Sequence, residues 1–423
     1  MDACVSDSFK KLLGIVSAGA RGQVYEGNDI DWNEIVRLAL EHSVCSLVGC
    51  ALLSNTFLMC PNNIRTGFIE QMRMHSSLNV IRRQRILSLI SEMGQMGIST
   101  KLLKGYTLAN CYAYPESRES VDTDLLIDIN DEARVIAMFR DKGFKVERRN
   151  VTSHHSVCQH KKYGIVELHV ELFDELVRDV WLKKSTTGVV LETTRHVQLD
   201  DGEYETLGYT DHLIFLVLHM VKHFISHGLS VGMMLDLAVY CERHHTQIDM
   251  ARLWKTLEQG QLSSFVSVVF QIMVDYGGFP TSLFAGMQRV SDNQVELVLG
   301  DLERGGRMGI KEADVRKMAG KEYSKLRLLR SKNRMHYYCY MYVWKIRRFI
   351  SALHPDDETS QARSPSHGQK CLLHYAYILK DTLTNLFRKL DGHMKHNRAK
   401  NRAVTIKEDV AHRVELFRAL GML

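Results

Sequence analysis

The chain has 423 residues, of which 45% are hydrophobic and 25% are charged, a composition that excludes disordered and fibrous proteins. Its formal charge of +6 is uneven, because the segment from Lys321 to the C-terminus holds 21 Lys and Arg residues but only nine Asp and Glu. This excess permits an anionic partner for the C-terminal region without requiring one.

Cysteine usage and hydropathy bear on where the protein works. The nine cysteines are scattered and never spaced as CxxC, which disfavours both a disulfide framework and a zinc finger. No apolar run approaches the roughly 18 residues that a transmembrane helix needs, and the N-terminal sequence lacks the apolar segment of a signal peptide. We therefore expect a cytoplasmic protein with no transmembrane segment.

Residues 1–97 are predicted to be helical. Asp31 is a suitable N-cap for a helix that starts at Trp32, and apolar residues follow at helical spacing. Residues 68–93 form a second helical segment, because they contain neither proline nor glycine. We find no catalytic constellation in this part of the chain.

The pattern changes at Gly97, where an α/β unit begins. A short β-prone run over 98–103 ends at Lys104-Gly105, and a helical stretch continues to Tyr112. Further strands are predicted at 121–129, 144–149, 156–160 and 164–170, with an amphipathic helix at 131–142. Gly143 stands where a glycine commonly ends a helix.

From Asp211 onward the chain is helical again, with helices predicted at 211–227, 232–245, 249–258 and 261–276. The fold class is therefore α+β and mostly α: a small mixed sheet with flanking helices. We expect an N-terminal helical region (1–97), an α/β core (98–205), a helical domain (206–350), a linker (351–368) and a basic C-terminal helical region (369–423).

Asp122 and Asp124 open the second predicted strand. Side chains two residues apart on a strand project from the same face, so the two carboxylates point together. Two like charges beside apolar neighbours are unfavourable without a cation, and Mg²⁺ is commonly held by such carboxylates together with substrate phosphates. The alternative is that Asp122 ends a turn and Asp124 is solvated, which is the commoner outcome for this motif alone.

Glu167 and His169 lie on a later predicted strand. Alternation places Val166 and Leu168 on the core face and leaves Glu167 and His169 on the other. A third carboxylate on a neighbouring strand is what a two-metal site needs. Without that context, an exposed glutamate and a half-buried histidine would be the simpler interpretation.

Lys104, Gly105 and Arg118 are candidate phosphate ligands. Glycine permits close approach of the backbone to a ligand, and a helix N-terminus attracts phosphate. Lys104 supplies a compact positive charge, and Arg118 lies four residues before Asp122. Each of these signals is weak by itself.

Together these motifs resemble the nucleotidyltransferase-like family of the DNA polymerase beta superfamily, in particular its branch of uncharacterised nucleotidyltransferases. The resemblance rests on Lys104-Gly105, Tyr114-Pro115, Arg118, Asp122-Thr-Asp124-Leu-Leu-Ile and Val166-Glu-Leu-His. It extends to residues 31–42 before the core and to residues 211–223 and 235–238 after it, covering roughly residues 30 to 260.

The resemblance implies a metal site and an activity. Asp122 and Asp124 match the metal-binding pair and Glu167 the third carboxylate, and all three are expected to be catalytic. Lys104 and Gly105 stand where the superfamily usually has a Gly-Ser pair that contacts the triphosphate. The implied reaction moves a nucleoside monophosphate from an NTP to an acceptor hydroxyl with Mg²⁺ or Mn²⁺. The acceptor stays open among a small molecule, a glycan intermediate, a protein and an RNA.

His219, His223 and His227 line one face of a predicted helix. This spacing suits a metal, but there is no HExxH pattern and no nearby Cys pair, so substrate-pocket or packing roles are favoured. We expect His169 and His219 to flank the nucleotide pocket.

Two basic segments, 321–348 and 393–402, leave a second function open. In the first, basic residues are interleaved with Tyr and Trp, a composition that suits nucleic-acid binding but equally suits a packed helix with a basic face. The alternative function is a non-catalytic nucleotide- or RNA-binding protein that uses these helices.

Overall fold

A computed structural model describes residues 5–120, 122–149, 154–173, 191, 193–200, 202–226, 228–305 and 410–423. Four features predicted from the sequence lie outside these residues: the basic segments 321–348 and 393–402, the linker 351–368, and His227.

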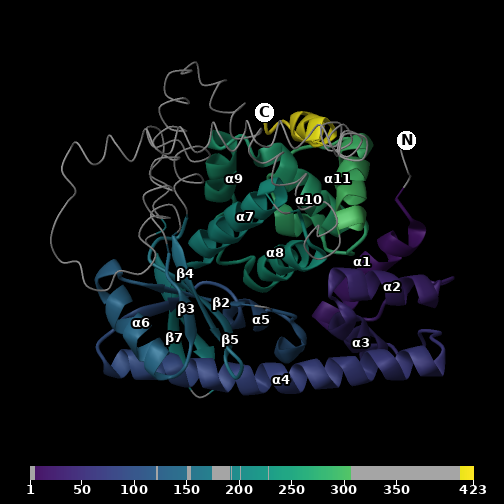
Figure 1. Cartoon of the computed structure of the whole chain (residues 1–423). Helices are drawn as coiled ribbons and strands as arrows, with labels where there is room; N and C mark the ends of the chain where they lie inside the picture. The colour runs from purple at the N-terminus through teal and green to yellow at the C-terminus, as the bar shows by residue number, and fades with distance from the viewer. Residues whose placement is uncertain are drawn as a thin grey trace, which may run out of the picture.

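The N-terminal helices are α1 (Asp7–Arg21), α2 (Trp32–His42), α3 (Cys45–Ser54) and α4 (Asn62–Gln95). Asp31 caps α2 as predicted, because its carboxylate accepts hydrogen bonds from the backbone N–H groups of Asn33 and Glu34 at 3.1 and 3.2 Å. The 34 residues of α4 make it about 50 Å long. Figure 1 shows it running beneath the sheet at one end and beneath α3 at the other.

The sheet has seven strands in the order β3-β4-β5-β2-β1-β7-β6. Its strands are β1 (Thr100–Leu102), β2 (Asp122–Ile127), β3 (Lys145–Glu147), β4 (His155–His160), β5 (Gly164–His169), β6 (Thr194–Leu199) and β7 (Gly202–Leu207). Strand β2 runs parallel to β5 and antiparallel to β1, so the sheet is mixed and the fold is α+β, as predicted.

Strands β6 and β7 were not among the predicted strands. They form an antiparallel hairpin at one edge of the sheet, and β7 pairs with β1. Their sequences, TRHVQL and GEYETL, are largely polar, and most of their side chains are exposed or half-buried. An edge hairpin in which only the last one or two residues of each strand are buried does not produce the apolar alternation by which strands are recognised.

The connections within the α/β unit are short. They are α5 (Tyr106–Ala109), α6 (Glu132–Asp141) and the 3₁₀ turns η1 (Pro115–Ser117) and η2 (Ile129–Asp131). Helix α6 occupies the predicted position and is followed by Gly143, whose φ of +87° is the left-handed conformation that glycine adopts without strain.

The helices after the sheet are α7 (Tyr209–Ser226), α8 (Val231–His244), α9 (Met250–Gln259), α10 (Ser263–Asp275) and α11 (Asp292–Gly305), with the 3₁₀ turn η4 (Thr281–Phe284). Residues 410–419 form a further helix, drawn in yellow in Figure 1 beside α10 and α11. The four helices predicted between 211 and 276 are confirmed, with a shift of one or two residues at every end.

Two hydrophobic cores hold the described residues together. The larger joins α1–α3 to α7–α11 and includes Phe9, Phe215 and Phe417. The smaller lies between the sheet, α6 and the C-terminal half of α4, where Ile90 packs in the same cluster as Leu125. Helix α4 contributes to both cores, so it ties the sheet to the helical part of the protein.

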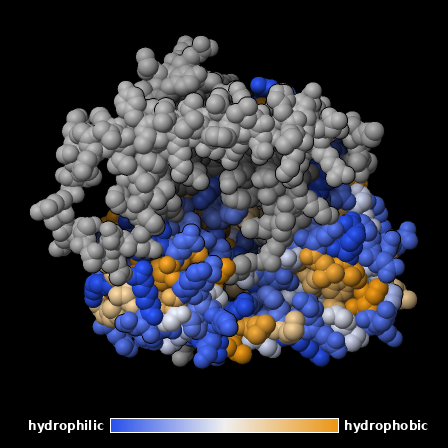
Figure 2. Space-filling view, in the orientation of Figure 1, coloured by the Kyte–Doolittle hydropathy of each residue, from blue (hydrophilic) through white to orange (hydrophobic). Residues whose placement is uncertain are grey.

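The surface is mixed. Figure 2 shows that hydrophilic residues predominate among the coloured ones and that hydrophobic residues form separate areas. Phe57 and Met59 are among the exposed apolar side chains. None of the helices in the described part of the chain is long and apolar enough to cross a membrane.

Candidate active site

The predicted carboxylates meet at the pair of parallel strands β2 and β5. In their register Asp124 lies opposite Glu167, and Asp122 lies two residues away on the same strand. Val166 and Leu168 are fully buried in the smaller core, as the alternation predicted. The core face of each strand thus fixes the direction in which the acidic side chains project.

His169 joins Asp124 and Glu167 into one group. Its Nε2 lies 3.1 Å from Oδ1 of Asp124 and 3.5 Å from Oε2 of Glu167. One ligand atom from each of the three side chains lies within 4.8 Å of the other two. Asp122 is not part of this set of three.

Lys104 supplies a positive charge to the same place. Its Nζ lies 3.2 Å from Oδ2 of Asp124 and 3.1 Å from Nε2 of His219. Burial alone would lower the pKa of Lys104, but the charges of Asp124, Asp122 and Glu167 raise it above its usual value. Lys104 is therefore protonated. We call Lys104, Asp122, Asp124, Glu167 and His169 the carboxylate cluster.

The two aspartates of this cluster differ in acidity. Burial raises the pKa of Asp122, and the neighbouring charge of Asp124 raises it further. Burial acts the same way on Asp124, but Lys104 and His169 outweigh it and hold the pKa of Asp124 below its usual value. Asp124 is therefore the firmly ionised member, and Asp122 is the one that accepts a proton more readily.

The donor atoms of the cluster fit a divalent cation. Asp124 is fully buried, and although Lys104 is close to its Oδ2, that oxygen accepts no aligned hydrogen bond from the described residues. The Nδ1 atom of His169 is likewise buried without a hydrogen-bond partner there. Buried polar atoms are normally satisfied, and carboxylate oxygens are the ligands that Mg²⁺ and Mn²⁺ prefer.

Arg118 has a partner that the sequence did not suggest. Its Nε and Nη2 each donate to a different carboxylate oxygen of Asp236 at 2.7 Å, and Tyr112 donates its hydroxyl hydrogen to the same carboxylate at 2.7 Å. This bidentate pair links the loop before β2 to α8. We call Arg118, Asp236 and Tyr112 the arginine cluster.

Gly105 lies between the two clusters. It follows Lys104 in the chain, and its carbonyl oxygen accepts a hydrogen bond from Arg118 at 3.4 Å. Its φ of +73° and ψ of −108° are open only to glycine in practice. Gly105 precedes α5, which has only four residues. The backbone turn at Gly105, and not a long helix, therefore brings Lys104 to the carboxylates.

His219, on α7, lines a cavity together with Lys104. Burial and the charge of Lys104 hold the pKa of His219 well below its usual value, so the ring is neutral and accepts a hydrogen bond from Lys104. The His219 and His223 rings lie 4.5 Å apart, which agrees with the predicted common helix face.

Two cavities meet at the carboxylate cluster. One, of about 340 Å³, is lined by Lys104, Glu167, His219 and Asp236. The other, of about 360 Å³, extends toward α4 and is lined by residues that include Arg82, Asn79, Tyr106 and Tyr163. Asp122, Arg118, Ser120 and Ile165 line both. The predicted site residues thus line one cavity or both, except Asp124 and His169, which are buried behind them and line neither.

Some residues near the site were not predicted. His154 and His155 lie beside His169, with ring centroids 5.0 Å from it, and Asp236 holds Arg118. A consecutive pair of histidines at the start of a strand was a visible signal for the first two. The partner of Arg118 lies 118 positions away, and no local pattern reveals it.

Comparisons with known proteins place the chain in a family. Neither the curated proteins nor the solved structures include a match to the chain. A family described as uncharacterised nucleotidyltransferase matches residues 28–277, which contain every predicted site residue and confirm the resemblance found in the sequence. Because the match covers more than half of the chain, the protein belongs to this nucleotidyltransferase family.

Proposed function

We propose that the protein is a metal-dependent enzyme that transfers a nucleoside monophosphate from an NTP to an acceptor hydroxyl and releases pyrophosphate. The observation that carries this proposal is the register of β2 and β5, which sets Asp124 opposite Glu167 with Asp122 on the same strand. Membership of the nucleotidyltransferase family supports the reaction class.

Asp122, Asp124 and Glu167 are the residues that would hold Mg²⁺ or Mn²⁺. Bound there, divalent ions would supply charge that aligns the acceptor oxygen with the α-phosphate and stabilises the departing pyrophosphate. His169 orients two of the three carboxylates, since its Nε2 lies within 3.5 Å of an oxygen of each. This arrangement keeps both side chains in place before any ligand arrives.

Lys104 and Asp122 have distinct parts in the proposal. Lys104 carries its proton at neutral pH and would bind a phosphate oxygen of the NTP from its position beside Asp124. Asp122 has a raised pKa and is the carboxylate better able to take the proton from the acceptor hydroxyl. Burial would raise the pKa of Glu167, but His169 and His155 hold it below its usual value, which suits a ligand more than a base.

The two cavities suit two substrates. Because they meet at Asp122, a nucleotide in one and an acceptor in the other would face each other across the carboxylates. The cavity that reaches α4 offers Arg82, Tyr106 and Tyr163, groups able to contact a phosphate or stack on a ring. The assignment of one substrate to each cavity is part of the proposal.

The test is transfer of label from nucleotide to acceptor. The purified full-length protein is incubated with a cell extract, Mg²⁺ and each NTP in turn, labelled once at the α-phosphate and once at the γ-phosphate. Transfer of the α-label with release of pyrophosphate is expected. Transfer of the γ-label would contradict the proposal, because it would show a phosphoryl transferase.

Two variants complete this test. Asp124→Asn should lower transfer at least about 1,000-fold, because it removes the firmly ionised carboxylate. Asp141→Asn changes an exposed aspartate at the end of α6 and should keep full activity. Isothermal titration with ATP should show binding that requires Mg²⁺ and is lost in Glu167→Gln. Turnover unchanged in Asp124→Asn would overturn the assignment of the site.

A further inference from the structure

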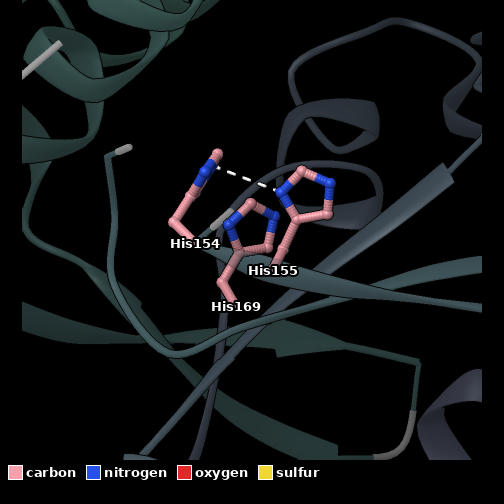
Figure 3. A group of neighbouring side chains, drawn as sticks. All are labelled: His154, His155 and His169. Carbon is pink, nitrogen blue, oxygen red and sulfur yellow. Dashed lines mark hydrogen bonds between the residues drawn. The ribbon is translucent and has the colours of Figure 1, made fainter. Parts of the chain in front are cut away.

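Three histidines meet beside the carboxylate cluster, and Figure 3 shows their imidazole rings turned toward one another. His155 is the first residue of β4 and lies opposite His169, the last residue of β5, in the antiparallel register. His154 lies in the bend before β4. Consecutive strand residues would point to opposite faces, so the bend is what lets His154 and His155 approach the same point.

The separations among these nitrogens suit a single metal ion. One ring nitrogen from each histidine lies within 4.8 Å of the other two. Nε2 of His154 and Nδ1 of His155 are 3.4 Å apart, which is long for a hydrogen bond. Two nitrogens bound at about 2.0–2.1 Å to one tetrahedral ion lie about 3.4 Å apart.

A second observation points to a ligand. His169 is 2% exposed, and its Nδ1 has no hydrogen-bond partner among the residues that the structure describes. A buried imidazole nitrogen without a partner is costly unless something binds it. The other nitrogen of His169 faces Asp124, and metal-bound histidines usually hold a carboxylate in this way.

The charges around the cluster also allow a cation. His154 is 8% exposed and His155 is half-buried, so little water competes for the space between their rings. Lys222 is close enough to His154 to interact with it electrostatically and opposes a cation. Asp124, 3.1 Å from His169, and Glu167, 3.7 Å from His155, favour one.

We propose that His154, His155 and His169 bind one divalent ion of the zinc class, separate from the oxygen-ligated ions of the transfer reaction. Three imidazoles select Zn²⁺, Co²⁺ or Ni²⁺ over Mg²⁺, because nitrogen ligands suit the former and oxygen ligands the latter. Three protein ligands leave a fourth position for water or a substrate oxygen. The proposal does not rest on the transfer activity, since it concerns binding alone.

Cobalt is the probe that tests it. Metal-free full-length protein is titrated with Co²⁺ in excess Mg²⁺, and the visible d–d absorption is followed. We expect one equivalent to bind with the bands of a tetrahedral, nitrogen-ligated ion. His154→Gln should weaken this binding about 100-fold or more, whereas His160→Gln, at the other end of β4, should leave it unchanged.

The variant Asp124→Asn separates this site from the carboxylate site. It should keep the Co²⁺ bands, because Asp124 is not one of the three ligands. Loss of the bands in Asp124→Asn with retention in His154→Gln would overturn the proposal, and so would wild-type protein that binds no Co²⁺ in excess Mg²⁺.

X-ray absorption of the Zn²⁺-loaded wild-type protein gives a test that needs no variant to fold. Three imidazole scatterers in the first shell would support the site, and a shell of oxygen alone would overturn it.

Discussion

The carboxylate cluster and the arginine cluster border the same cavity, yet they are built differently. In the arginine cluster, Arg118 and Asp236 form two parallel hydrogen bonds of 2.7 Å, and Tyr112 adds a third to the same carboxylate. In the carboxylate cluster, Asp124 and His169 each keep a buried atom without a hydrogen bond from the described residues. The carboxylate of the arginine cluster is hydrogen-bonded at both oxygens, whereas the carboxylate cluster keeps buried polar atoms without a hydrogen bond from the described residues.

This difference indicates what each cluster is for. A buried ion pair with all its hydrogen bonds made holds two parts of a fold together, here the loop before β2 and helix α8. A buried group of carboxylates with unsatisfied atoms is held ready for something that is not part of the chain. We therefore expect the first to govern stability and the second to govern ligand binding.

Removing one carboxylate from each cluster should give the largest contrast. Asp236→Asn leaves Arg118 buried without its counter-ion and should lower the free energy of unfolding by about 3–5 kcal/mol. Glu167→Gln should lower it by less than about 1 kcal/mol, because that side chain is partly exposed and its partners are histidines. Urea denaturation measures both, and equal losses would show that the clusters do not differ.

Mg²⁺ and Mn²⁺ should stabilise the protein by binding to the carboxylate cluster. At 100 times the dissociation constant, Mg²⁺ or Mn²⁺ should add about 2.7 kcal/mol to the free energy of unfolding of the wild type. This gain in the free energy of unfolding should vanish in Asp124→Asn and persist in Asp141→Asn. Thermal denaturation across a range of Mg²⁺ concentrations measures it, and stabilisation retained in Asp124→Asn would place the ion elsewhere.

His42 tests the effect of burial on a polar side chain outside both clusters. It is 2% exposed, and burial lowers its pKa to about 4. Above pH 6.5 the His42 ring is neutral in both the folded and the unfolded protein, so its contribution to the free energy of unfolding is fully present. As the pH falls toward 4, the unfolded chain gains a proton that the folded chain does not, and stability is lost.

Between pH 7 and pH 5 this loss should amount to about 2 kcal/mol for His42. The variant His42→Leu should show that much less pH dependence than the wild type, as urea denaturation at the two pH values would reveal. An identical slope in both proteins would mean that His42 does not titrate differently on folding.

Gly105 joins the two clusters, and replacing it should have a modest effect on stability. Gly105→Ala forces a side chain into a backbone conformation that only glycine adopts readily, at a cost of about 1–2 kcal/mol. Space is not the obstacle, since the added Cβ would lie 3.8 Å from the carbonyl oxygen of Asp122, an ordinary van der Waals distance. Thermal denaturation measures the loss, and Gly97→Ala, at a turn with φ of +76°, is the matched control for strain away from the site.

Much of the carboxylate cluster could be predicted from the sequence, because its signals are local. Asp122 and Asp124 share a face by strand alternation, and Val166 and Leu168 orient Glu167 in the same way. The register that brings β2 beside β5 is not local; the family resemblance supplied the role of Glu167 as the third carboxylate, and the structure supplies the register. The fold class could be predicted as well, because helix and strand periodicity are local features of the sequence.

What escaped prediction depends on contacts between distant segments. The pairing of the Arg118 guanidinium with Asp236 on α8 was not predicted, and the phosphate contact expected of Arg118 stays a prediction. The polar hairpin of β6 and β7 is fixed by pairing with β1 rather than by its own apolar pattern. His154 joins His169 only because the chain bends before β4. None of these contacts leaves a periodic trace in the sequence.

Helix α4 has a consequence for how the protein unfolds. Phe68 anchors its first half in the larger core, and Ile86 and Ile90 anchor its second half in the smaller one. If either core unfolds, the half of α4 that packs in it loses its tertiary contacts. Because helix formation is cooperative, the other half of α4 then becomes less stable as well. The helix therefore couples the two cores thermodynamically. A substitution in the helical part of the molecule can in this way alter how often the sheet opens to solvent.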